Sequence, residues 1–174
     1  VKRVHVRSER MVSLEHRHLA VLRFEVTLLD GNAPVVISSQ LLNRQDGVDE
    51  YHVTAAALGE GRDPRRARKF DRRVLEPKLQ RHDDRDDHSG GEVTLGYRCV
   101  NSGMTIACAY RHEIDTPSAF EVETSISDDL AKSVFTIHGR TGETIRLTKY
   151  VAYHTSRGIP AQELADRCHR TIAR

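Results

Sequence analysis

The sequence predicts an all-β protein, an antiparallel sandwich of two sheets followed by one C-terminal helix. Apolar and polar residues alternate over residues 22–28, within a strand predicted at residues 19–29, which is the period of a strand with one buried and one solvated face. Turn signals divide residues 92–155 into short segments with no helical pattern between them, as in sandwiches. Only the residues after 158 repeat at helical spacing.

The strand at residues 19–29 has two distinct faces. Its polar row is Arg23, Glu25 and Thr27, and the row expected to be buried consists of Ala20, Leu22, Phe24, Val26 and Leu28. Asp30-Gly31 follows as a strong turn signal, and a second apolar run at residues 34–37 begins a strand predicted over residues 34–42. We therefore predict that the two strands form a hairpin.

Two further strand segments precede residue 60. Residues 2–14 alternate as a strand, and residues 15–18 form a polar link. Residues 43–50 are predicted to be a loop. Residues 51–58 fit either a strand or a short helix because of their alanine triplet, and we favour a strand.

Residues 59–91 form a charged segment. Residues 62–81 hold nine Lys and Arg against three acids, and residues 83–87 then hold four Asp against one Arg. Asp63-Pro64 could start a helix to about residue 70, and residues 74–79 could add a short strand. The acidic cluster with its two glycines predicts an exposed, mobile loop.

The last part of the chain contains five predicted strands and the helix. The strands cover residues 92–100, 104–113, 118–126, 132–138 and 143–155. The helix covers residues 160–173, with Pro160 at its first position and an apolar stripe of Ala161, Leu164, Ala165, Cys168 and Ile172. This stripe must be buried against either the sandwich or a missing partner domain.

The length and composition of the chain limit the classes of protein to which it can belong. A chain of 174 residues suits one domain, and no apolar run approaches the roughly 18 residues of a membrane span. The start of the chain has no signal-peptide core and no initiator Met, which suggests a fragment or processed chain. The net charge of +2 gives no indication of nucleic acid. Cys99 and Cys108 are staggered across a predicted hairpin, so we predict reduced cysteines and a cytoplasmic location.

Few residues are candidates for a catalytic or metal-binding role. Glu121 and Glu123 lie two apart on one strand, about 6–7 Å from each other, a separation that overlaps that of inverting glycosidase carboxylates. The alternative is a solvated outer face, which we favour because a flat sheet offers no pocket to raise a pKa. His16 and His18 form a His-x-His pair, with His5 and His52 elsewhere, and we predict no metal site.

Two basic features of the sequence can each be interpreted in more than one way. Residues 62–81 could bind nucleic acid, dock on another domain or subunit, or be a solvated loop, and we predict no nucleic-acid partner. Lys149 shares a strand face with Val151 and Tyr153. It is therefore either a buried or domain-facing amine, or a side chain that extends along the sheet to solvent.

Two stretches of strand sequence resemble a known family. The segments ERMVSL and LAVLRFEVT near the N-terminus, and IRLTKYVAYHTS at residues 145–156, resemble the N-terminal β-sandwich domain of glycoside hydrolase family 65. The resemblance covers roughly residues 7–156 and implies a galactose-mutarotase-like super-sandwich, truncated at its start. It implies a sandwich domain over residues 1–157 and, over residues 158–174, a linker helix toward a missing catalytic (α/α)6 barrel.

The resemblance also implies a function for the intact enzyme. Family members are inverting hydrolases and phosphorylases of α-glucosyl disaccharides, and phosphorylases use inorganic phosphate as co-substrate, with no other cofactor. The chain would be a non-catalytic domain that packs on the barrel and contributes to a homodimer, and would be inactive alone. No catalytic residue is carried over. Candidate interdomain or ligand contacts within the matching stretches and the link are Arg10, His16, Arg17, His18 and Lys149.

The alternative is a stand-alone carbohydrate-binding or structural interaction sandwich. Carbohydrate-binding modules usually stack sugars on exposed aromatic side chains. The chain has no Trp, four Phe and five Tyr, and most of these lie in apolar rows, which disfavours sugar binding.

Overall fold

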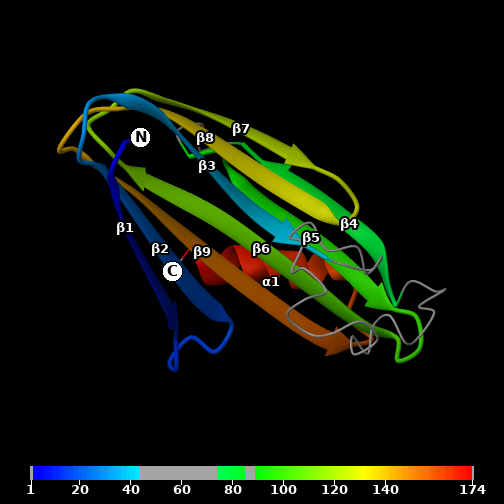
Figure 1. The fold of residues 1–174 in the computed structure, drawn as a ribbon. Helices are drawn as coiled ribbons and strands as arrows, with labels where there is room; N and C mark the ends of the chain where they lie inside the picture. The colour runs from blue at the N-terminus through cyan, green and yellow to red at the C-terminus, as the bar shows by residue number, and fades with distance from the viewer. Residues whose placement is uncertain (1, 44–73, 85–88, 174) are drawn as a thin grey trace, which may run out of the picture.

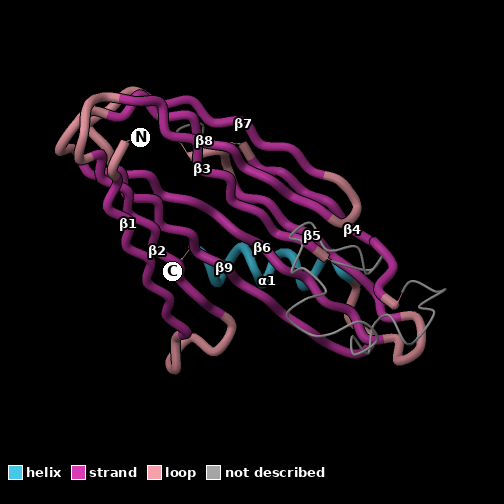
Figure 2. Tube along the Cα trace, in the orientation of Figure 1, coloured by secondary structure: helices cyan, strands magenta, loops and turns pink. Residues whose placement is uncertain are grey.

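The computed structural model describes residues 2–43, 74–84 and 89–173, and these form nine strands and one helix in three layers (Figures 1 and 2). All strand pairs are antiparallel, which confirms the predicted all-β sandwich. The large sheet contains, in order, β1 (Val4–Val12), β2 (Leu19–Leu28), β9 (Thr144–Arg157), β6 (Met104–Asp115), β5 (Glu92–Cys99) and β4 (Leu75–Asp83). The small sheet contains β3 (Ala33–Leu42), β8 (Leu130–Gly139) and β7 (Phe120–Ile126).

The main core lies between the two sheets. Alternate residues of β5, β6 and β9 point toward the small sheet, as the period of a strand requires. The side chains with 0 or 1 % exposure in this layer include Val93, Leu95, Tyr110, Phe135, Ile137 and Ile145.

The helix α1 (Ala161–Ile172) covers the opposite face of the large sheet (Figure 1). Its predicted apolar stripe is buried there against Ala107, Ala109 and Ala152. Gly96 of β5 also permits the close approach, since a Cβ at this position would lie 3.1 Å from the Cβ of Ala161. The stripe is therefore buried against the sandwich, one of the two alternatives that the sequence left open.

The predicted hairpin between residues 19–29 and 34–42 is wrong. β2 pairs with β1 and β9 in the large sheet, whereas β3 pairs with β8 in the small sheet. Gly31 does have the left-handed backbone of a tight turn, with φ of 73°. A turn signal fixes a reversal of the chain but not the hydrogen-bond partner, and here the chain crosses from one sheet to the other.

Several smaller predictions have clear outcomes. The strand predicted at residues 74–79 continues to Asp83 as β4, so the first Asp of the acidic cluster lies in a strand and not in a loop. Pro160 is the N-cap of α1 and not its first residue. All three cysteines are free. The predictions for residues 44–73, including the strand at 51–58, the helix at 63–70 and most of the basic segment, lie outside the described residues, as does most of the acidic cluster.

Among the described residues, no helix has the length and apolar character needed to span a bilayer.

Candidate functional site

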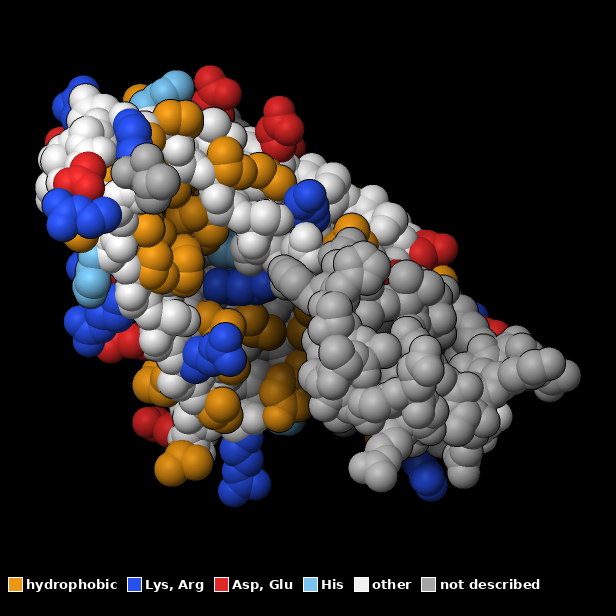
Figure 3. Space-filling view, in the orientation of Figure 1, with side chains coloured by type: hydrophobic (Ala, Val, Ile, Leu, Met, Phe, Trp, Pro, Cys, Tyr) orange, Lys and Arg blue, Asp and Glu red, His pale blue; other side chains and the backbone are white. Residues whose placement is uncertain are grey.

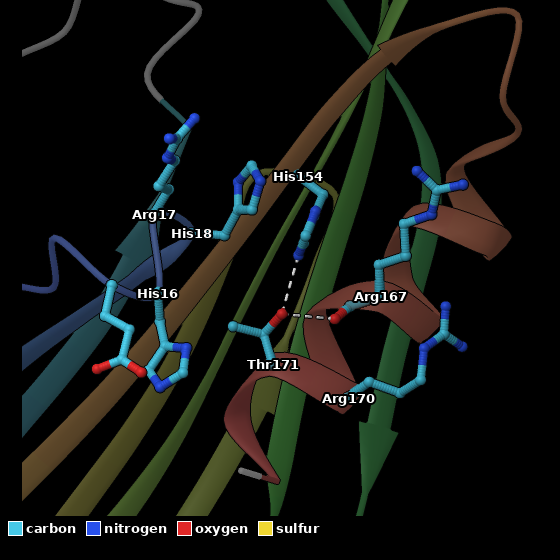
Figure 4. Close-up of a pocket in the computed structure, with 8 residues that line it drawn as sticks. His16, Arg17, His18, His154, Arg167, Arg170 and Thr171 are labelled. Atoms are coloured by element: carbon cyan, nitrogen blue, oxygen red, sulfur yellow. Dashed lines mark hydrogen bonds between the residues drawn. The ribbon is translucent and has the colours of Figure 1, made fainter.

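A pocket of about 330 Å³ opens between the β1–β2 link, β9 and the C-terminal half of α1 (Figure 4). We call it the histidine pocket. Three segments far apart in the sequence meet here because β2 and α1 both lie against β9. Its lining residues are Glu15, His16, Arg17, His18, His154, Arg167, Arg170 and Thr171.

The link is held in place by backbone hydrogen bonds. The Leu19 amide donates to the His16 carbonyl at 2.8 Å, and the His16 amide donates to Ser13 Oγ at 2.8 Å. The Tyr153 amide then donates to the His18 carbonyl at 3.1 Å, which fastens the link to β9. The hydrogen-bonded link therefore holds His16 and His18 at the edge of the large sheet.

Two imidazoles are stacked in the middle of the pocket. The ring centroids of His18 and His154 are 4.0 Å apart with planes tilted by 30°. Thr171 donates its hydroxyl proton to the Arg167 carbonyl at 2.9 Å, so it accepts from His154 Nε2 at 2.9 Å. His154 therefore carries a proton on Nε2, and its Nδ1 is free to gain a second one.

The charge around these rings is positive. Figure 4 shows His18 and His154 between Arg17 on one side and Arg167 and Arg170 on the other. Burial, followed by electrostatic contributions from the neighbouring His18, Arg167 and Arg170 side chains, lowers the pKa of His154. Such a site can attract an anion and repel a cation.

The structure brings together three of the five candidate contact residues. His16, Arg17 and His18 line the histidine pocket. Arg10 is exposed on β1 opposite Leu22, and Lys149 lies on the inner face of β9, so neither belongs to it.

Five lining residues were not among the sequence-based candidates: Glu15, His154, Arg167, Arg170 and Thr171. The signal available was that polar residues of the predicted C-terminal helix lie opposite its apolar stripe. Nothing local indicated that this helix would lie beside the His-x-His link.

Lys149 takes part in a polar network between the sheets. Its Nζ donates to the Gln40 carbonyl at 2.7 Å and lies 4.5 Å from the centroid of the Tyr110 ring. Burial lowers its pKa to about 8. Of the two sequence-based alternatives, the structure favours the buried amine, in contact with the small sheet.

His112 is the neighbour of Lys149 across the β6–β9 pair and was missed by the sequence reading. Its side chain is 2 % exposed, and its Nε2 lies 2.8 Å from Ser39 Oγ. Its buried Nδ1 has no hydrogen-bond partner. Burial, with a smaller effect of the Lys149 charge, lowers the pKa of His112 to about 3, so the ring is neutral at pH 7.

Replacing Lys149 with methionine is expected to raise the free energy of unfolding at pH 7 by about 1 to 2 kcal/mol, because the buried ammonium is removed. The folded pKa of about 8 lies below the unfolded value of roughly 10.5. The cost of burying the charge is therefore complete below pH 8 and declines as the pH rises toward about 10.5. Denaturant unfolding should show the variant's advantage shrinking at about pH 10.

The matched control is Lys78→Met on β4, where the lysine side chain is 44 % exposed and pairs with Glu76 at 3.0 Å. We expect this control to change stability little at either pH. If Lys149→Met is no more stable than the wild type at pH 7, or gains as much at about pH 10 as at pH 7, burial of the Lys149 ammonium does not destabilise the fold as stated.

The other candidates for chemistry are separated from the pocket. Glu121 and Glu123 are exposed on β7, while Phe120 and Val122 pack toward the core, which confirms the solvated-face interpretation. Within residues 2–43, 74–84 and 89–173, no group of three or more His, Cys, Asp or Glu side chains is placed to hold a metal ion. His52 lies outside these residues.

The amino-acid sequence matches a protein-family model over its whole length. The family model described as "Glycosyl hydrolase family 65, N-terminal domain" matches residues 1–174. The chain therefore belongs to the N-terminal domain family of the family 65 glycosyl hydrolases. This confirms the resemblance drawn from the strand sequences.

Two mycobacterial relatives are described as uncharacterized glycosyl hydrolases. The chain is 31 % identical over 152 residues to one from Mycobacterium tuberculosis (strain ATCC 25618 / H37Rv) and 29 % identical over 152 residues to one from Mycobacterium leprae (strain TN). Each alignment covers 87 % of this chain and 17 % of the relative. The chain thus spans less than a fifth of the length of these relatives.

A solved structure shares the fold. The protein named "Putative kojibiose phosphorylase from human microbiome" superposes with a TM-score of 0.71 at 7 % sequence identity. The match covers 99 % of this chain and 19 % of that chain. At this identity the likeness shows the fold alone.

Proposed function

We propose that the chain is a non-catalytic N-terminal domain of a larger family 65 enzyme, which acts on α-glucosyl disaccharides with inversion. Its role is to pack against a catalytic (α/α)6 barrel that lies beyond residue 174 and to contribute to a homodimer. The observation that carries this proposal is an uncovered apolar sheet face. The relatives, which are about five times as long as this chain, have ample further sequence to cover it.

The uncovered face belongs to β1 and β2. The large sheet has six strands and the small sheet three, so the small sheet covers only part of it. Val4 and Val6 are opposite Leu28 and Val26, and therefore point to the inner face, yet they remain 49 % and 48 % exposed. Val12, on the same face, is 68 % exposed.

Figure 3 shows hydrophobic side chains gathered over this side of the molecule, around a hollow that contains a Lys or Arg side chain. Contiguous exposed apolar surface of this kind marks interaction sites. We call it the open face, and it consists of the inner side chains of β1 and β2 together with Tyr153 of β9.

The non-catalytic role is supported by the described carboxylates. Glu121 and Glu123 lie on an exposed strand face, and neither lines the histidine pocket. A glycosidase acid needs an environment that raises its pKa. The choice of disaccharide, the use of inorganic phosphate and a cytoplasmic location, which the free cysteines favour, belong to the same proposal.

The alternative of a carbohydrate-binding module is less well supported. Sugar platforms need exposed aromatic rings. Among the described large hydrophobic side chains, the exposed aromatic is Tyr153, at 44 %. Apart from Tyr153, the exposed large hydrophobic side chains of this face, Val4, Val6 and Val12, are aliphatic, which favours protein packing over sugar stacking.

The docking role is tested by charge substitutions on β1. Val6→Lys and Val12→Lys, made together in the longer protein, should lower its melting temperature and activity because they place two ammonium groups in the interface. The same pair in the 174-residue chain should change its stability little, since both side chains are about half exposed or more.

The control pair is His5→Lys and Met11→Lys on the opposite face of the same strand, where Met11 is 58 % exposed. We expect this pair to leave the longer protein unchanged. Equal effects of both pairs, or no effect of the Val6 and Val12 pair, would argue against docking through the open face.

A further inference from the structure

We propose that the histidine pocket binds a phosphate group, as the free ion or as a small phosphate ester. This site is lined by other residues than the open face, which it adjoins where the rings of His18 and Tyr153 meet edge to face, and it does not depend on the proposed function. The argument rests on the excess of positive charge, the stacked imidazoles, the donors available and the size of the pocket.

The arginines are only partly neutralised. Glu163 Oε1 lies 3.1 Å from Arg167 Nε and 3.5 Å from Arg170 Nη2, so one carboxylate is shared by two guanidinium groups. Arg17 adds a third guanidinium, and Glu15 is the one carboxylate among the lining residues. A dianion placed between them gains charge-assisted hydrogen bonds, which guanidinium forks make well to phosphate.

The stacked imidazoles are the second observation. A second proton on His154 is unfavourable, because this ring is partly buried, stacked 4.0 Å from the ring of His18 and close to Arg167 and Arg170. A bound dianion removes this penalty. His154 can then gain a proton on Nδ1 and become a charged donor, so anion binding and proton uptake are linked.

The charged and polar side chains around His154 come from the β1–β2 link and from α1. His18 comes from the link, and Arg167, Arg170 and Thr171 come from α1. Glu15 and Glu163 are the nearby carboxylates of the link and the helix, and Glu163 is tied to the two arginines. The balance of charge facing the ring is therefore positive.

The volume of the histidine pocket and the hydrogen-bond donors that line it favour a small anion as the ligand. A volume of about 330 Å³ lies at the low end of small-molecule sites, which span roughly 300–1,000 Å³. Metal cations are disfavoured by the guanidinium groups. Single-stranded nucleic acid needs a basic groove with several aromatic platforms, and the lining residues include neither Phe, Tyr nor Trp.

The test is a calorimetric and NMR titration of the 174-residue chain with inorganic phosphate, methyl phosphate and sodium sulfate at constant ionic strength. We expect saturable one-site binding, with shifts of the His18 and His154 imidazole signals. Methyl phosphate binding as well as phosphate would identify a site that accepts esters, and binding of phosphate alone would identify a site for the free ion.

Sulfate tests proton uptake by the pocket without interference from the ligand, because the charge of sulfate is constant between about pH 6 and pH 8, whereas phosphate itself titrates in this range. Sulfate should bind several-fold more tightly at the lower pH, and saturating sulfate should raise the pKa of His154. Binding that is independent of pH and leaves the imidazole signals unmoved would overturn the proposed site.

Variants separate this pocket from general attraction to a basic chain. Arg17→Gln with Arg170→Gln should weaken phosphate binding about ten-fold or more, and Glu163→Gln should strengthen it by freeing both helix arginines. The matched control, Arg140→Gln with Arg157→Gln, removes the same charge from exposed positions that do not line the pocket. Equal losses in both double variants, or no saturable binding at all, would refute the proposal.

Discussion

Acidification from pH 7 to about pH 4.5 is expected to lower the free energy of unfolding of this chain by about 3 kcal/mol through His112 alone. Its imidazole is buried between the sheets, touches the rings of Tyr110 and Phe135, and faces the ammonium of Lys149. A second proton on this ring would be a buried charge beside a like charge. The folded chain therefore excludes that proton.

The pH window follows from the two pKa values. The folded pKa is about 3, whereas the unfolded value is roughly 6.5. Above pH 6.5 neither state is protonated, and this contribution to stability is complete. As the pH falls toward 3, only the unfolded chain gains the proton, so stability is progressively lost.

Denaturant unfolding across this pH range measures the effect. His112→Gln keeps a hydrogen-bonding group near Ser39 but cannot titrate, so its stability should fall much less between pH 7 and pH 4.5. The carboxylates of Glu25 and Asp30, whose pKa values are lowered by hydrogen bonds from Arg146 and Arg3, contribute mainly below this window. A wild-type chain whose stability is flat from pH 7 to pH 4.5 would contradict the account of His112.

Leu164→Ala is expected to lower the free energy of unfolding by about 3 kcal/mol, within the usual range of roughly 2–5 kcal/mol for a buried leucine. Leu164 is fully buried in the layer between α1 and the large sheet. Its neighbours Ala107, Ala109 and Ala152 are small and lie on strands, so they cannot move to fill the cavity. The loosened helix should also bind phosphate more weakly, because it holds Arg167 and Arg170.

The control is Leu14→Ala, the same change at a leucine that is 93 % exposed in the β1–β2 link. We expect it to change stability by less than about 0.5 kcal/mol. Thermal and denaturant unfolding of both variants provide the measurement. A similar, small loss in the two variants would mean that α1 is not docked as described.

The individual strands and the helix were predictable because the spacing of apolar residues shows which side of each element is buried. Val26 and Leu28 are buried as expected, whereas Ala20, Leu22 and Phe24 of the same row are only partly buried because they lie on the open face. The five stripe residues of α1 are those the spacing indicated. The partner of a strand is not a local property. The turn at Gly31 therefore indicated a hairpin, whereas β2 and β3 belong to different sheets.

The histidine pocket was only half predictable for the same reason. His16, Arg17 and His18 are adjacent in the sequence, but His154 and the helix residues join them only through packing on β9. His112 did have a local signal, a polar residue in the apolar row of Ile106 and Tyr110. The sequence could not show that its Nδ1 would be buried without a partner.

The central claim, that this chain is a non-catalytic domain of a larger enzyme, is tested most directly by an activity measurement. Phosphorolysis and hydrolysis of a panel of α-glucosyl disaccharides would be measured for the 174-residue chain and for a longer protein from the same coding region that continues beyond Arg174. We predict activity in the longer protein only. Activity in the 174-residue chain itself would contradict the claim and direct attention back to Glu121 and Glu123.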